Sequence, residues 1–288
     1  MVSKATLLHL RIPFSFYLLP FYVFALAISP NPKGLFLLFS FIIIHFLFYP
    51  SSNGYNSYYD KDEESIGGLK NPPPVSKELL IVSLVLEAFA IALSFLISWQ
   101  FACMIFVISM VSRAYSHPTI RLKKYPILGL ITVAIFQGAY TFYMSFMGIT
   151  GGEMNILYNE KAIYAGALCS LMLFGSYPMT QIYQHGEDAR RGDKTMSRLL
   201  GIEGTFLWTG GIFFLASCGF FLFFLNFYSF TIATIFPLFL LPVLIYFLFW
   251  FLKVRKDNNK ADFQSTMRLN MLSSVCFVSF FLFLYFIQ

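Results

Sequence analysis

Long apolar runs, separated by short polar segments, dominate the chain. Two of them read FLLFSFIIIHFLFY at 36–49 and FPLFLLPVLIYFLFWFL at 236–252. A helix crosses the hydrocarbon core of a bilayer with about 20 residues. On this basis the pattern predicts an all-α polytopic membrane protein, a bundle of nine transmembrane helices. The predicted spans are 12–29, 34–52, 78–98, 101–116, 126–148, 162–184, 204–225, 229–252 and 267–287.

Composition supports this class of protein. Hydrophobic residues make up 58% of the 288 residues and charged residues 12%, with a mean hydropathy of +0.69. A soluble domain carries about 25% charged residues, so too little charge is present to cover a surface that faces water. The composition therefore argues against a soluble globular protein and against a disordered chain. We expect one domain over 1–288, with two similar four-helix stretches at about 12–116 and 126–252 and a last helix at 267–287.

The basic residues predict how the chain is oriented in the membrane. If the nine spans are correct, 18 of the 20 Lys and Arg residues lie on the side of the N-terminus. Cytoplasmic loops of membrane proteins collect Lys and Arg, so we expect the N-terminus inside and the C-terminus outside. The net charge of +6 then reflects topology, and we expect no nucleic acid as a partner. Since 11 of the 14 acidic residues fall on the same side, any chemistry on a charged molecule is expected there, at the cytoplasmic face of a bacterial inner (cell) membrane.

The first segment with candidate chemistry follows the second span. If the helix continues into it, Asn56, Asp60 and Glu64 fall at i, i+4 and i+8 and share one face. Oxygen ligands on one face suit Mg²⁺, which takes one or two carboxylates and completes its shell with water and phosphate oxygens. Lys70 follows in a loop with Gly-Gly and Pro-Pro-Pro and can reach a phosphate there. The alternative is a solvated helix end with mixed charges.

A second acidic segment follows the sixth span, where Gln184 and Asp188 stand at i and i+4 with Glu187 adjacent. Two acidic helix ends on one side of the membrane can hold one or two metal ions between them. A third segment, at 113–124, ends the fourth span with four cations, which a diphosphate needs beyond the metal. Taken alone, the cations of this third segment are explained by the positive-inside rule.

At these residues the chain resembles the UbiA superfamily of intramembrane prenyltransferases. That family has an N-D-x-x-D-x-x-x-D segment after its second helix, a D-x-x-x-D segment after its sixth, a Y-[ST] loop with a following basic residue after its fourth, and a basic residue before its first. The residues at the corresponding positions are Asn56, Asp60 and Glu64; Gln184 and Asp188; Tyr115, Ser116 and Arg121; and Arg11. The chain departs from the pattern at Ser57, Glu64 and Gln184, where the family has aspartates.

The resemblance implies transfer of a prenyl group from a prenyl diphosphate to a membrane-soluble acceptor, with Mg²⁺ as cofactor and the lipid bilayer as surroundings. It gives Asp60, Asp188 and Tyr115 catalytic roles. The expected metal ligands are Asn56, Asp60, Glu64, Gln184 and Asp188. The expected diphosphate-binding residues are Arg11, Lys70, Arg121 and Lys194, and the expected cavity residues are Tyr59, Glu87, Gln137 and Tyr140. For Glu87, a structural partner inside the bundle is the alternative.

Two other functions stay open from the sequence. One is a membrane terpene cyclase of the same superfamily, which releases diphosphate without an acceptor. The other is a transporter or a non-catalytic lipid-binding relative, which the missing acids at positions 57 and 184 favour. Against transport, the polar residues gather at one face of the membrane, whereas transporter sites lie near the midplane. The sequence does not identify the acceptor or the length of the prenyl chain.

Overall fold

The computed structural model describes residues 2–154 and 158–288, and this part of the chain is helical and contains no strand. The α-helices are α1 (Lys4–His9), α2 (Ile12–Ser15), α3 (Leu19–Ile28), α4 (Gly34–Ile42), α5 (Tyr49–Asp60), α6 (Lys77–Ser94), α7 (Trp99–Ser116), α8 (Pro126–Val133), α9 (Thr141–Thr150), α10 (Glu160–Thr180), α11 (His185–Arg191), α12 (Met196–Phe227), α13 (Phe230–Lys256) and α14 (Phe263–Phe286). Short 3₁₀ turns are η1 (Phe16–Leu18), η3 (Leu122–Lys124), η6 (Ile182–Gln184) and η7 (Asn258–Lys260).

Two π-helical stretches interrupt the helices that run from α4 to α5 and from α8 to α9. They are η2 (Ile43–Phe48) and η4 (Ala134–Tyr140). η4 packs closely on α10, because a Cβ on Gly138 would lie 2.6 Å from the backbone Cα of Ser170. Such π-bulges are rare and frequently occur at functional sites.

Helices occupy each stretch in which apolar runs predict a span. Seven helical stretches of the described chain are long and apolar enough to cross a membrane. The other two predicted spans, 78–98 and 101–116, coincide with α6 and α7, which have 18 residues each and carry ionic side chains such as Glu87 and Arg113. The count of nine spans, the orientation in the membrane and the repeat of two four-helix stretches stay predictions.

Several helices extend beyond the predicted boundaries. The helix predicted at 34–52 continues to Asp60, and the one predicted at 204–225 begins at Met196. A hydropathy pattern marks only the apolar part of a helix, whereas backbone hydrogen bonding continues into the polar residues that flank it. Residues before 12 also form a helix, α1, which is separated from α2 by Arg11 in the left-handed conformation.

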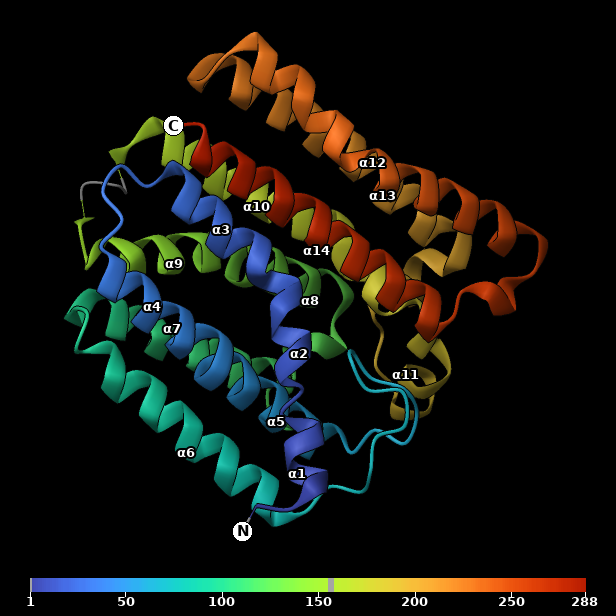
Figure 1. The fold of residues 1–288 in the computed structure, drawn as a ribbon. Coiled ribbons are helices and arrows are strands. Elements are labelled where there is room, and N and C mark those ends of the chain that lie inside the picture. The colour runs from blue at the N-terminus through green and yellow to red at the C-terminus, as the bar shows by residue number, and fades with distance from the viewer. Residues whose placement is uncertain (1, 155–157) are drawn as a thin grey trace.

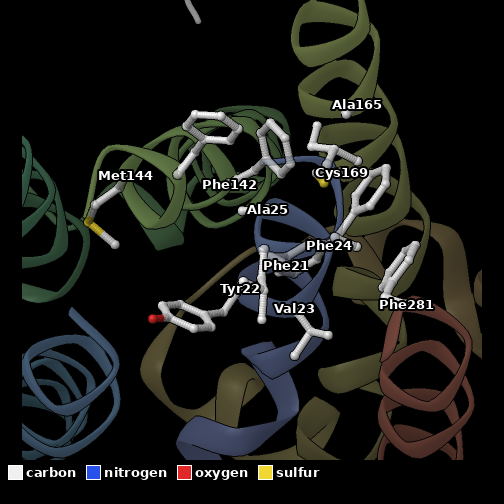
Figure 2. Packing of buried hydrophobic residues seen from close by; sticks show 14 of the residues in the cluster. Phe21, Tyr22, Val23, Phe24, Ala25, Phe142, Met144, Ala165, Cys169 and Phe281 are labelled. Carbon is white, nitrogen blue, oxygen red and sulfur yellow. The ribbon is translucent and has the colours of Figure 1, made fainter. Parts of the chain in front are cut away.

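The core of the bundle is built around α3. Its residues from Pro20 to Ile28 are all buried, as expected for a helix that is apolar on every side. The ring of Phe24 stacks on Phe281 of α14 at 4.3 Å between centroids and meets Phe142 of α9 at 5.5 Å. Figure 2 shows these rings with Ala165 and Cys169 of α10 around them. The aromatic contacts join two segments distant in sequence to one central helix.

α12 and α13 lie side by side at one edge of the bundle and α6 lies at the opposite edge, with α3, α10 and α14 between them (Figure 1). The loop after α5 lies beside α11 at one end of the bundle. The residues that carry the predicted chemistry gather at this end.

Candidate active site

A cavity of about 350 Å³ opens between the helices at the end where α5, α7 and η6 terminate. Its wall includes side chains from both acidic segments and from the loop after α7, although these lie far apart in sequence. The charged residues that line it are Arg11, Asp60, Asp62, Lys123, Asp188, Arg191 and Asp193. The two acidic segments therefore face one cavity, as the sequence predicts.

The first acidic segment contributes Asn56 and Asp60 from the last turn of α5, and both side chains line the cavity. The prediction that Glu64 shares their helical face is wrong. The helix ends at Asp60 because Lys61 takes the left-handed conformation with φ of 51°. Glu64 then lies outside the cavity, with 48% of its side chain exposed, and pairs with Arg190. Asp62, two residues after the helix end, lines the cavity instead.

The second acidic segment has its predicted position but not all of its predicted contacts. Gln184 and Asp188 both line the cavity. The Gln184 amide nitrogen donates to the backbone carbonyl of Ser65 at 3.2 Å, and Asp188 accepts a hydrogen bond from the Thr195 hydroxyl at 3.1 Å. A carboxylate at position 184 could not donate to that carbonyl, so the glutamine serves here as a tie between the two segments.

Glu187 strengthens the same tie. This buried carboxylate accepts the backbone N–H groups of Glu63 and Glu64 at 3.0 and 3.2 Å. It also pairs with Arg191 at 2.7 Å. Charge-assisted hydrogen bonds of this kind are the stronger ones in proteins. Side chains of Gln184 and Glu187 thus bind backbone groups of the loop after α5 and hold this loop against α11.

Basic side chains hold the carboxylates that line the cavity. Asp60 accepts hydrogen bonds from Arg121 at 3.2 Å and from the Lys123 ammonium. Arg121 also makes a two-pronged contact with Asp193, at 3.0 and 2.7 Å. Arg121 therefore lies at the site as predicted, and Lys123, one of the four cations of its segment, lies there too.

A further ion pair joins Asp62 to Arg191 at 2.5 Å. Burial raises the pKa of Asp62, and the charge of nearby Asp60 adds to this, while Arg191 opposes it. Sequence reasoning missed Asp62 and Asp193 as cavity residues, since neither stands at a helical interval from the recognised positions.

Three basic residues around the site have unusual backbone conformations. Arg11, Lys61 and Arg121 are the non-glycine residues with positive φ in the described chain, at 46°, 51° and 46°. A side chain disfavours this left-handed region, at a cost of order 1–3 kcal/mol. Each of these residues lies where the chain turns toward or away from the site, so the strained backbone conformations are found around the site.

Arg11 is 8% exposed and lines the cavity. Its guanidinium donates to the carbonyls of Gly67 and Asn53, both at 3.1 Å, and more weakly to Asn56 Oδ1 at 3.5 Å. The structure does not bring Lys70 and Lys194 to the cavity. Both are exposed, because Lys70 lies on the outer part of the loop and Lys194 follows the turn at Gly192. Their predicted contact with a diphosphate stays a prediction, and neither side chain lines the cavity.

A pair of tyrosines forms part of the cavity wall. The hydroxyls of Tyr115 and Tyr177 are hydrogen-bonded to each other, and the Gln181 amide donates to the Tyr177 oxygen at 2.8 Å. Tyr115 was predicted, whereas Tyr177 is indistinguishable in sequence from the many other tyrosines of the chain.

Of the residues predicted to line the cavity, Gln137 does so and three others do not. The Tyr140 hydroxyl donates to the carbonyl of Met104 at 3.0 Å, and the ring of Tyr59 packs on Tyr55 at 4.8 Å between centroids. Glu87 is paired with Arg113 at 2.7 Å between α6 and α7. The structural alternative for Glu87 is therefore the correct one.

The donor atoms at the site suit a hard divalent cation. Asn56, Asp60 and Asp188 present one amide and two carboxylates to one cavity, and Mg²⁺ typically takes one or two carboxylates and draws its other ligands from water and phosphate. In residues 2–154 and 158–288 no group of three or more His, Cys, Asp or Glu side chains is arranged to hold a metal by itself. The donor set thus fits Mg²⁺ that arrives together with a phosphate-bearing ligand.

Comparison with known proteins finds solved structures with the same fold. No curated protein is similar enough in sequence to count as a relative. Solved structures of a UbiA homolog from Archaeoglobus fulgidus share the fold, one bound to DMAPP and Mg²⁺ with a TM-score of 0.72 at 19% identity, covering 99% of this chain and 100% of that one. The form bound to GPP and Mg²⁺ has a TM-score of 0.70 at 19% identity, covering 98% and 99%.

A UbiA homolog from Aeropyrum pernix K1 has a TM-score of 0.72 at 16% identity, covering 94% of this chain and 98% of that one. The model of the UbiA prenyltransferase family matches residues 17–273. The chain belongs to the UbiA prenyltransferase family.

Proposed function

We propose that the protein transfers a prenyl group from a prenyl diphosphate to a membrane-soluble acceptor, at the cytoplasmic end of the bundle and with Mg²⁺ as cofactor. The observation that carries this proposal is the meeting of Asn56, Asp60 and Asp188 in a cavity that continues between apolar helices. A site with oxygen ligands at its mouth and aromatic walls behind them suits a molecule with an anionic head and an apolar tail. The relatives solved with GPP or DMAPP and Mg²⁺ support the choice of donor.

The diphosphate is assigned to the mouth of the cavity. Asn56, Asp60 and Asp188 would hold Mg²⁺ there, and when bound it neutralises negative charge on the leaving oxygens. Arg11 and Lys123, which both line the cavity, supply further N–H donors. Arg121 holds Asp60 in position and is itself held by Asp193.

The prenyl tail is assigned to the inner part of the cavity. Phe48 and Phe136 form part of its wall, and Tyr115 lines the cavity nearer the mouth, at the end of α7. Aromatic ring faces stabilise a nearby cation by about 0.5–2 kcal/mol, which favours loss of the diphosphate. Helices packed around the cavity exclude water, which would otherwise capture the allylic cation.

The proposed orientation places this mouth in the cytoplasm. Under the predicted topology, 18 of the 20 Lys and Arg residues lie on that side, in accord with the positive-inside rule. The cell membrane of a bacterium is the proposed location.

The experiment that tests the function uses the full chain in lipid nanodiscs with geranyl diphosphate and a membrane extract as the source of acceptor. We expect Mg²⁺-dependent release of diphosphate and a new lipid heavier by one prenyl group. Diphosphate release without any acceptor would identify a terpene cyclase. Tight binding of the donor without release would identify a non-catalytic relative.

A further inference from the structure

The inner part of the cavity differs from its mouth in the kind of polar group it presents. The seven charged residues of the cavity wall come from helix ends and loops: Arg11, the end of α5, the loops at 62 and 123, and the segment 188–193. The wall further in is formed by the middle parts of helices, and its polar side chains are neutral. The cavity therefore has an ionic mouth and a neutral interior.

Three neutral polar side chains of this interior, of which Gln137 is exposed and the other two are half-buried, have no hydrogen-bond partner among the described residues. Gln137 of η4, Ser176 of α10 and Asn270 of α14 line the cavity, and none of the side-chain hydrogen bonds within the described residues involves them. Other hydroxyls of the wall are used by the protein itself, such as Thr209, which donates to the carbonyl of Gly175 at 2.9 Å. Gln137, Ser176 and Asn270 are thus available to a ligand.

The helix rise gives the depth of these groups. Asn270 lies seven residues into α14 and Gln137 eleven residues after Pro126, where α8 begins. At 1.5 Å per residue these positions are about 10 and 16 Å from the ends of their helices. A molecule that contacted both amides would lie in the inner part of the cavity, beside the proposed position of the prenyl tail, where an acceptor would be bound.

The charges of the cavity wall disfavour a second anion. Its three basic residues face four acidic ones, and each of the three already contacts oxygens of the chain: Lys123 binds Asp60, Arg191 binds Asp62, and Arg11 binds the carbonyls of Gly67 and Asn53. The diphosphate competes for the same cations. An acceptor that carried a carboxylate or a phosphate into the interior would therefore lose its hydration without gaining a cation.

We propose that the acceptor is an uncharged molecule whose hydroxyl, carbonyl or amide groups are bound by Gln137 and Asn270. This inference rests on the proposed function and adds the substrate class. Each amide both donates and accepts, so the two amides can bind neutral polar groups of an acceptor. In the transfer, the bond from C1 of the prenyl group to the diphosphate oxygen breaks with its electron pair, a bond forms from C1 to the acceptor, and the acceptor's proton passes to the released diphosphate.

The test compares two probes of nearly equal shape, 4-hydroxybenzamide and 4-hydroxybenzoate, which differ in charge. Their binding to the full chain in nanodiscs is measured calorimetrically with Mg²⁺ and the inert donor geranyl S-thiolodiphosphate present. We expect the amide to bind at least about tenfold more tightly than the carboxylate. We expect Gln137→Met and Asn270→Leu each to weaken binding of the amide by about tenfold and to leave affinity for the donor analogue unchanged.

Matched controls are Gln264→Met and Asn226→Leu, which change exposed residues of α14 and α12 that do not line the cavity. These should bind both probes as the unaltered chain does. Equal or tighter binding of the carboxylate, binding of neither probe, or equal losses in the controls would overturn the inference while donor binding persists. If the donor analogue itself fails to bind in the presence of Mg²⁺, the proposed function fails.

Discussion

The amide nitrogen of Gln184 donates to the backbone carbonyl of Ser65 across 119 positions of sequence, at 3.2 Å. This contact explains why the chain tolerates a glutamine where its family usually has an aspartate. The residue ties the loop after α5 to the start of α11, and Glu187 extends the tie through the N–H groups of Glu63 and Glu64. Gln184, which departs from the family pattern, thus helps to hold the two acidic segments together.

Gln184→Glu is predicted to destabilise the protein, although it restores a carboxylate to the second motif. The new side chain cannot donate to the Ser65 carbonyl and would leave that oxygen facing a negative charge. We expect a loss of about 1–3 kcal/mol, measured by thermal unfolding in detergent. Gln264→Glu, on an exposed part of α14, is the control and should stay within about 0.5 kcal/mol. Equal effects of the two variants would refute the tie.

Asp62→Asn and Glu64→Gln are predicted to differ, because only Asp62 lines the cavity. Asp62→Asn removes the charge that holds Arg191, and we expect diphosphate release to fall about tenfold. Glu64 pairs with Arg190 at the surface, with side chains 48% and 59% exposed, and such pairs contribute about 0–1 kcal/mol. Glu64→Gln should therefore leave the Mg²⁺ dependence of the rate unchanged. A larger loss for Glu64→Gln would restore it as a metal ligand.

The pair Glu87–Arg113 is predicted to support the fold and not the reaction. Arg113→Leu leaves the Glu87 carboxylate, which is 7% exposed, without a partner, and we expect about 1–3 kcal/mol of destabilisation. The double variant Glu87→Leu/Arg113→Leu should recover part of this loss, because no buried charge is left unpaired. Thermal unfolding of the two variants tests the pair. A role of Glu87 in the cavity would show instead as weaker donor binding in the double variant at unchanged stability.

Asp188→Asn is predicted to slow prenyl transfer by about 100-fold or more, the range for loss of one group that stabilises a transition-state charge. The matched change Glu203→Gln affects a surface residue that forms a long ion pair with Arg255 at 3.7 Å, and it should leave the rate unchanged. The rate of diphosphate release at saturating geranyl diphosphate and Mg²⁺ is the measurement. Equal rates for the two variants would remove Asp188 from the site.

Much of the fold follows from the sequence because a membrane helix is a property of composition over about 20 residues. Asn56, Asp60 and Asp188 were also predictable, since they lie in helices whose spacing sets their direction. The end of α5 could not be predicted, because the local sequence pattern does not indicate that Lys61 takes the left-handed conformation. Once the helix ends there, Asp62 turns toward the cavity, whereas in a continuing helix it would lie about 200° around from Asp60.

Long-range pairing explains the other differences. From the sequence, Glu87 is a candidate functional residue. The packing of α6 on α7 places Arg113 beside it, and the two form an ion pair. Lys70 and Lys194 read as phosphate ligands by motif, but their positions depend on how a loop and a turn fold. Sequence spacing does not contain that information.

The most direct test of prenyl transfer follows an isotope label from the donor. The full chain in nanodiscs receives ¹³C-labelled geranyl diphosphate, Mg²⁺ and a membrane extract, and lipids are analysed by mass spectrometry. The proposed function predicts a labelled lipid one geranyl group heavier than an unlabelled precursor, lost on chelation of Mg²⁺ and with Asp188→Asn and retained with Glu203→Gln. Label recovered only in unreacted geranyl diphosphate, with the donor shown to be bound, would contradict it.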